Sequence, residues 1–194
     1  MLQNFKEKQA SRMQTKFPLL CGHLSLDLVN TEVVRRGQRI DLLPSARELN
    51  DWLQAVGLSD LWDGQHAEAM HDSLLVMRHE LRWHFETIAE QQTIPPSLVQ
   101  QLEAYIERAP FTYRLVDGKL RALPVGEPSA MLQSLIALDV LKLIADDKLR
   151  RLKRCANEDC VLLFLDESGR RKWCSMKICG NRQKVAQFQQ RQSE

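Results

Sequence analysis

Four cysteines in the last quarter of the sequence are spaced like the ligands of a single metal ion. They form two close pairs, Cys155 with Cys160 and Cys174 with Cys179. Each pair can offer two thiolates from a tight turn, and the spacer between the pairs lets the chain return to the same tetrahedral ion. Four thiolate ligands favour zinc over calcium or magnesium. From the spacing alone, buried structural cysteines and an iron–sulfur cluster stay open as alternatives.

The segment that carries these cysteines is also basic. Residues 148–194 contain 12 Lys and Arg against 5 Asp and Glu, a net charge of +7. Residues 1–147 contain 15 against 20, a net charge of −5. A basic segment joined to an acidic body indicates a polyanionic partner for the segment. The alternative is a solvated basic surface that binds nothing.

The residues between and after the cysteine pairs predict a small folded module that would hold the ligands. We expect a strand over residues 161–166, a turn over 167–171 and a return strand over 172–174. From Gly180 onward the pattern predicts a helix. A cysteine knuckle, a hairpin and a helix that begins at the last ligand make a treble-clef-like arrangement. The N-terminus of that helix would offset part of the thiolate charge.

The residues upstream of this module predict a mainly helical body. Apolar residues recur at helical spacing in the segments 24–34, 45–57, 64–92, 97–108 and from Pro128 onward. Ser45 and Glu48 have the spacing of a capping box. Residues 35–43 predict a loop, and residues 111–125 predict one β-hairpin around Asp117-Gly118. We expect the last of these helices to continue into the basic stretch 148–154.

The expected fold class is therefore mainly α. It consists of a helical N-terminal domain with one β-hairpin, plus a small C-terminal treble-clef-like zinc finger built from a β-hairpin and a helix. Residues 1–19 are expected to form an arm that leads into the body.

The cysteine module resembles the CGNR zinc-finger family, which is named after the residues found here at 179–182. The similarity covers both cysteine pairs and also Phe164, Asp166, Arg170, Arg171, Trp173 and Lys184. Upstream, residues 24–31, Asp41-Leu42 and the helix over 49–53 resemble the ABATE domain that commonly precedes this finger. The resemblance implies an arm (1–19), an ABATE-like domain (20–147) and a CGNR finger (148–194). It also implies a stress-induced transcription regulator that binds DNA.

We therefore expect a DNA-binding protein whose zinc is structural, because four cysteines leave no open coordination position for catalysis. The expected nucleic-acid contacts are Arg170, Arg171, Lys172, Asn181, Arg182 and Lys184. For Arg182, the alternative is a bracing ion pair with Asp166 or another nearby carboxylate. A protein-interaction adaptor with an acidic partner is the first rival function. An enzyme that acts on a small molecule through the N-terminal domain is the second, although we expect no enzyme.

Within the body, polar residues at one helix end give a candidate ligand pocket, made of Asn30, Thr31 and Arg78. The alternative is that they make local hydrogen bonds at that helix end. We expect residues 20–147 to fold independently. We also expect them to bind no nucleic acid, because the acidic charge of the body repels phosphates. We expect the body to act as a sensor or a dimerisation unit, with a small-molecule effector and a homodimer as candidate features.

Other residues whose types could bind a metal or act in catalysis are not expected to form a site. His79 and His84 are separated by about 140° around a helix and cannot share one ion from one face. Cys21 and His23 are sequence neighbours, and such neighbours rarely face each other as nucleophile and base.

Three tryptophans of the body, Trp52, Trp62 and Trp83, are expected to belong to the core. The sequence has no uninterrupted apolar run of about 18 residues, which predicts no transmembrane helix. Its first residues lack the apolar centre of a secretory signal. We therefore expect a cytoplasmic protein with reduced cysteines and no membrane partner.

Overall fold

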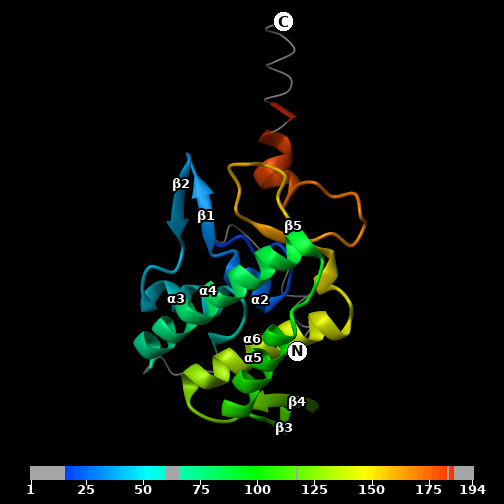
Figure 1. The fold of residues 1–194 in the computed structure, drawn as a ribbon. Helices are drawn as coiled ribbons and strands as arrows, with labels where there is room; N and C mark the ends of the chain where they lie inside the picture. Colours follow the sequence, from blue (N-terminus) through cyan, green and yellow to red (C-terminus); the bar gives the residue numbers. More distant parts are fainter. Residues whose placement is uncertain (1–15, 60–65, 117, 183, 186–194) are drawn as a thin grey trace, which may run out of the picture.

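The computed structural model describes residues 16–59, 66–116, 118–182, 184 and 185 (Figure 1). Helices make up most of the body. They are α2 (Leu24–Val29), α3 (Ala46–Ala55), α4 (Ala67–Gln91), α5 (Pro96–Arg108) and α6 (Pro128–Ala145). The mainly α fold class is confirmed.

Polar residues define where several helices begin. Ser45 precedes α3, accepts a hydrogen bond from the amide of Arg47 and donates one to the carboxylate of Glu48. Glu127 precedes α6, and its carboxylate accepts hydrogen bonds from the first amides of that helix. The acidic group is also favoured by the helix dipole at this end. These caps fix the phase of α3 and α6, and therefore which side chains each helix turns toward the core.

A short hairpin stands where the sequence predicted the end of a helix and a loop. Strands β1 (Glu32–Arg35) and β2 (Gln38–Asp41) pair antiparallel. The helix predicted over 24–34 ends at Val29, because the hydroxyl of Thr31 donates to the carbonyl of Leu28 and the chain then extends. The prediction of a loop over 35–43 is therefore wrong.

Within the described residues the body thus has two hairpins rather than the predicted one. The second, β3 (Phe111–Val116) with β4 (Lys119–Pro124), lies where the sequence predicted it. Of its turn residues, Asp117 lies outside the described residues and Gly118 has a positive φ of 69°.

The finger uses a different strand pair from the one predicted. After α6 the chain forms a turn, η3 (Leu149–Arg151), and then β5 (Leu152–Arg154), which pairs antiparallel with β6 (Leu163–Leu165). The first cysteine pair occupies the loop between these two strands. Residues 172–174 form no strand, so the prediction of a return strand there is wrong. The helix α6 also stops before the basic stretch, since Asp147 adopts a positive φ of 52°.

Body and finger share one hydrophobic core. Trp52 and Phe85 of the body belong to the same buried cluster as Phe164 and Cys174 of the finger. Strand β5 lies against α4, and β6 lies against α2. The expected core position of Trp52 is confirmed, whereas Trp83 is 62% exposed and Trp62 lies outside the described residues.

By length and composition α6 is apolar enough to cross a membrane, with a mean hydropathy of 1.4 over its 18 residues. Half of it is buried, and it lies against α2, α4 and α5. It also carries a buried carboxylate, Asp139, which accepts hydrogen bonds from the amide and the hydroxyl of Ser25 in α2. This packing accounts for its composition as that of a central core helix.

Candidate metal centre and nucleic-acid interface

The four cysteines of the finger converge on one point. Cys155 follows β5 directly, Cys160 precedes β6, and Cys179 lies in the π-helical turn η4 (Met176–Gly180). All four sulfur atoms lie within 4.8 Å of one another, and those of Cys160 and Cys174 are 3.9 Å apart. Zinc–sulfur bonds of about 2.3 Å in a tetrahedron require sulfur–sulfur separations of about 3.8 Å. The donor set and its spacing therefore fit zinc.

Neighbouring groups hold the sulfur atoms in this arrangement. The amide of Cys174 donates to the sulfur of Cys155 at 3.4 Å, and the side-chain amide of Asn157 donates to that of Cys179 at 3.5 Å. The carbonyl of Asn157 also accepts from the amide of Cys160 and closes the knuckle between the first two ligands. Such donors stabilise thiolate ligands and orient them.

The crowding of the sulfur atoms also shows why a cation belongs among them. A shared hydrogen bond with Cys155 raises the pKa of Cys160 to about 12 and raises the pKa of Cys174 as well. The pKa of Cys155 falls to about 2, because the thiols of Cys160 and Cys174 hydrogen-bond to its thiolate. The protein alone thus favours one thiolate and two thiols, and a divalent cation supplies the charge that lets all four ionise.

Arg171, one of the predicted DNA contacts, braces the finger. Its Nε donates to the carbonyl of Trp173 at 2.9 Å, and its guanidinium also bonds to the carbonyl of Cys174. The same group stacks on the ring of Phe164 at 4.4 Å. These bonds place the guanidinium against the chain just before the third ligand, so it supports the metal site from within the fold.

Asp166 also braces the finger, through bonds to the residues on both sides of it in sequence. Its carboxylate pairs with Lys153 at 2.7 Å and accepts hydrogen bonds from the amide of Arg171. The hydrogen bond from Lys153 is the main reason that the pKa of Asp166 falls to about 2. The ion-pair partner of Asp166 is therefore Lys153, and the predicted alternative pairing of Arg182 with Asp166 is not found.

The remaining predicted contacts lie on the surface of the finger. Arg170, Lys172, Asn181, Arg182 and Lys184 are all exposed. Among the residues that the structure describes, no carboxylate forms an ion pair with any of these four cations.

A hollow of about 330 Å³ opens on this surface, lined by Arg170, Arg171, Lys172, Trp173 and Met176. Gly180 allows Met176 and Trp173 to close one side of it: a Cβ at Gly180 would come within 2.5 Å of the Met176 sulfur and 3.3 Å of the Trp173 ring. The surface therefore combines cations with one aromatic and one thioether side chain.

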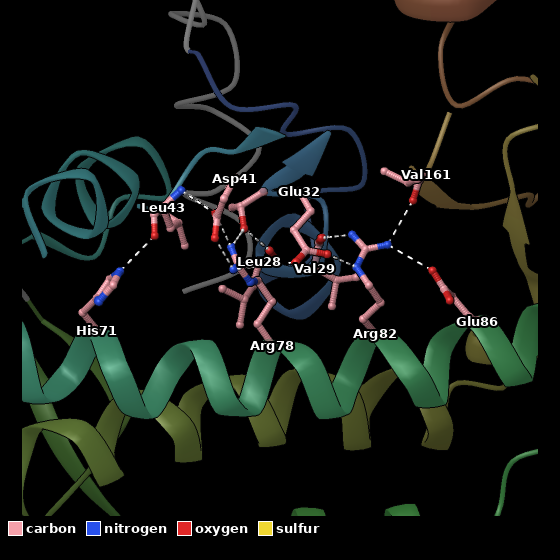
Figure 2. A network of polar contacts seen from close by, with 11 residues as sticks. Leu28, Val29, Glu32, Asp41, Leu43, His71, Arg78, Arg82, Glu86 and Val161 are labelled. Carbon is pink, nitrogen blue, oxygen red and sulfur yellow. Dashed lines mark hydrogen bonds and ion pairs between the residues drawn. The ribbon is translucent and has the colours of Figure 1, made fainter. Parts of the chain in front are cut away.

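Of the three residues predicted as a ligand pocket, Arg78 and Thr31 meet in a packed polar network around Arg78 (Figure 2), whereas Asn30 bonds to Leu163 of the finger. Arg78 of α4 donates to both carboxylate oxygens of Asp41, at 2.7 and 2.6 Å, and to the hydroxyl of Thr31. Asn30, Thr31 and Arg78 are all buried. Only Thr31 bonds locally, to the carbonyl of Leu28, whereas Asn30 and Arg78 bond to protein groups that are distant in sequence.

Asn30 joins the body to the finger. Its side-chain amide donates to the carbonyl of Leu163 at 2.9 Å, and its side-chain oxygen accepts from the amide of Leu163 at 2.9 Å. Leu163 lies in β6, whose other edge pairs with β5. The single side chain of Asn30 thus satisfies the open edge of β6 as a neighbouring strand would.

Sequence reasoning missed Arg82, which lies one helical turn after Arg78. Its guanidinium forms ion pairs with Glu32 at 2.5 Å and Glu86 at 3.2 Å, and donates to the carbonyl of Val161 at 3.2 Å (Figure 2). The signal in the sequence was a pair of arginines four residues apart on the apolar face of the 64–92 helix. Buried arginines require buried partners.

The histidines and Cys21 take structural positions. His79 is exposed and His84 is buried against Gln101, so the two do not converge. Burial raises the pKa of Cys21 to about 12, and its thiol donates to the Leu163 carbonyl at 3.8 Å. His23 bonds instead to Asp139, at 3.4 Å. These contacts give Cys21 no activating base.

Two family models match the chain. Residues 22–147 match the ABATE family, described as "putative stress-induced transcription regulator". Residues 151–192 match the CGNR zinc finger. No curated protein matches the chain.

Proposed function

Because the chain belongs to the ABATE family and carries a CGNR zinc finger, we propose that it is a transcription regulator that binds DNA through that finger. Zinc held by Cys155, Cys160, Cys174 and Cys179 cross-links the finger. The observation that carries the proposal is a set of exposed cations on this cross-linked surface that pair with no carboxylate of the described residues: Arg170, Lys172, Arg182 and Lys184. The proposed function is binding rather than catalysis, and the proposed compartment of the protein is the cytoplasm.

Zinc makes this surface suitable for recognition. Structural zinc in small fingers supplies about 10–16 kcal/mol of apparent binding free energy, which appears as folding free energy. Cys179 and Arg182 are three residues apart, on the same short helical segment. The metal therefore restrains the backbone that carries Arg182 and Lys184, and DNA binding loses less conformational entropy than it would with a flexible tail.

The contacts divide by chemistry. Lysine and arginine side chains neutralise phosphates and set affinity, whereas bidentate arginine contacts with guanine add about 1–3 kcal/mol of discrimination each. Trp173 and Met176 offer an apolar surface beside Arg170 and Lys172, suited to contact with a sugar or a base edge. Arg171 acts on DNA only indirectly, by bracing the loop that presents its neighbours.

A salt titration of Arg182→Ala tests the proposal. Each lost phosphate contact with duplex DNA should lower the slope of log affinity against log salt by about 0.9. We expect weaker binding and a flatter slope, with zinc content and helicity unchanged. Arg121→Ala, on the β3–β4 hairpin, is the matched control and should bind like the wild type.

Selection of bound sequences from a random DNA pool, with and without a zinc chelator, addresses the rival function. Enrichment of one sequence that disappears with chelator would support a regulator. Binding of acidic proteins without any DNA binding would replace the proposal with an adaptor that uses the same surface.

A further inference from the structure

The tip of the β1–β2 hairpin is a compact basic surface that belongs to the body. Arg35, Arg36 and Arg39 lie within five residues of one another, and all three side chains are exposed. Within the described part of the chain, no carboxylate pairs with any of the three. The body has a net charge of −5, so this local concentration of positive charge is opposite in sign to its surroundings.

The hairpin presents these arginines from a rigid turn. Arg35 pairs with Gln38, which leaves only Arg36 and Gly37 in the connection. Both connecting residues have positive φ, 54° at Arg36 and 76° at Gly37. Positive φ at both central positions is the geometry of a type I′ turn, the tightest connection that fits the twist of a hairpin. A bulky arginine at such a position is uncommon and is held there by the strands.

The base of the hairpin is clamped to α4. Glu32 and Asp41 face each other as its first residue pair. Arg78 binds both oxygens of Asp41, and Arg82 pairs with Glu32 at 2.5 Å. The two acidic residues of the hairpin are thereby paired with buried arginines of α4 rather than with the arginines of the tip.

The buried arginine that binds the hairpin also binds the finger. The guanidinium of Arg82 binds Glu32 of the hairpin and the carbonyl of Val161 in the finger at once. Asn30, two residues before the hairpin, binds both backbone groups of Leu163. Figures 1 and 2 show the hairpin and the finger projecting from the same side of α4. Hairpin and finger are therefore fixed relative to each other by shared buried bonds.

We propose that the β1–β2 hairpin is a second nucleic-acid contact, whose arginines bind the phosphate backbone of the duplex held by the finger. This inference rests on the proposed function of the finger. The buried bonds of Asn30 to the finger and of Arg78 to Thr31 and Asp41 then have a definite role, which is to hold a basic hairpin beside a basic finger. The proposal replaces, at this one edge, the expectation that the acidic body avoids DNA.

Duplex DNA suits this surface for a geometric reason. The backbone of a duplex offers a regular row of phosphates, and a contact outside the finger extends the row that the protein covers. Backbone contacts of this kind fix orientation and register without reading sequence.

The test compares two triple variants that remove the same charge from two hairpins of the body. The first, Arg35→Gln with Arg36→Asn and Arg39→Gln, keeps the turn, because Asn-Gly is a preferred type I′ sequence. The control, Arg114→Gln with Lys119→Gln and Arg121→Gln, neutralises the β3–β4 hairpin. Zinc content and circular dichroism establish that both variants are folded. Binding is measured by fluorescence anisotropy with a duplex of mixed sequence across a salt series.

The first variant should lower the salt slope by about 1.8 for two lost phosphate contacts or about 2.7 for three. At about 0.15 M salt the same relation gives roughly a fivefold loss of affinity per contact. The control should leave slope and affinity at the wild-type values. Equal effects of the two variants, or no effect of the first while Arg182→Ala flattens the slope, would overturn the hairpin contact and leave the finger's function standing. A wild-type protein that binds no duplex would overturn both.

Discussion

Replacing Asn30 by alanine should loosen the finger from the helical body. The substitution removes both hydrogen bonds to Leu163, whose backbone is buried and whose side chain is 0% exposed. Strand β6 has no second neighbouring strand among the described residues, so no other backbone can take over these bonds. The amide and the carbonyl of Leu163 would both lose their partner, apart from the weak thiol contact of Cys21.

The size of the effect follows from those two groups. A buried polar group that is left unsatisfied costs about 1–3 kcal/mol. Two such groups give about 2–6 kcal/mol, and partial entry of water into the space left by the amide favours the lower half of that range. For a chain of this size, about 3 kcal/mol corresponds to a fall in Tm of roughly 6–12 °C.

Urea unfolding of the zinc-loaded protein, followed by circular dichroism, measures the loss of stability. The rate at which a colorimetric chelator removes zinc measures the loosening of the finger itself. Asn50→Ala, an exposed asparagine of α3, is the matched control and should change stability by less than about 0.5 kcal/mol.

Two results would contradict this reasoning. If the urea midpoint of unfolding of Asn30→Ala equals that of the wild type, the stability of the β6 edge does not depend on the Asn30 side-chain amide. If stability falls but zinc is removed at the wild-type rate, Asn30 stabilises the body alone and does not connect it to the metal site.

Further consequences of the structure can be checked separately. Cys174→Ser should abolish stoichiometric zinc in elemental analysis and also lower the unfolding midpoint of the body, because Cys174 belongs to the shared core; retention of one zinc per chain would show that three cysteines suffice. Arg171→Met should speed zinc removal by the chelator while leaving the salt slope of DNA binding unchanged, whereas a flatter slope would make Arg171 a direct phosphate contact. Burial holds the pKa of Cys21 at about 12, so its thiol is neutral at pH 8. Cys21 should therefore resist iodoacetamide in the zinc-loaded protein, with reactivity rising only as the pH approaches 12; rapid labelling at pH 8 would show that the site opens. If the body is the dimerisation unit that the sequence analysis expects as one of two roles, Leu115→Glu, on the exposed apolar face of the β3–β4 hairpin, should reduce sedimentation mass at high concentration. A monomer in both proteins would contradict that role.

The predictions that succeeded rest on local signals. The spacing of the cysteines predicted their convergence, since a tetrahedral ion imposes short-range geometry on close pairs. Ser45 with Glu48 marked the start of α3, and Asp117-Gly118 marked the β3–β4 turn.

The predictions that failed depend on partners distant in sequence. Nothing near residues 161–166 indicates that β6 pairs with β5 rather than with 172–174, because the choice is made by burial against α2 and α4. The β1–β2 hairpin was missed for a related reason. Its strands are short, and its base is fixed by Arg78 and Arg82, which lie some forty to fifty residues away from Asp41 and Glu32.

The shared core has a consequence for how the protein responds to metal supply. A ligand that binds the folded state alone raises its stability by mass action, by about 2.7 kcal/mol when its free concentration is 100 times its dissociation constant. Because Phe164 and the ligand cysteines pack in the same cluster as Trp52 and Phe85, that gain reaches the whole chain. The population of folded ABATE body should therefore rise and fall with free zinc.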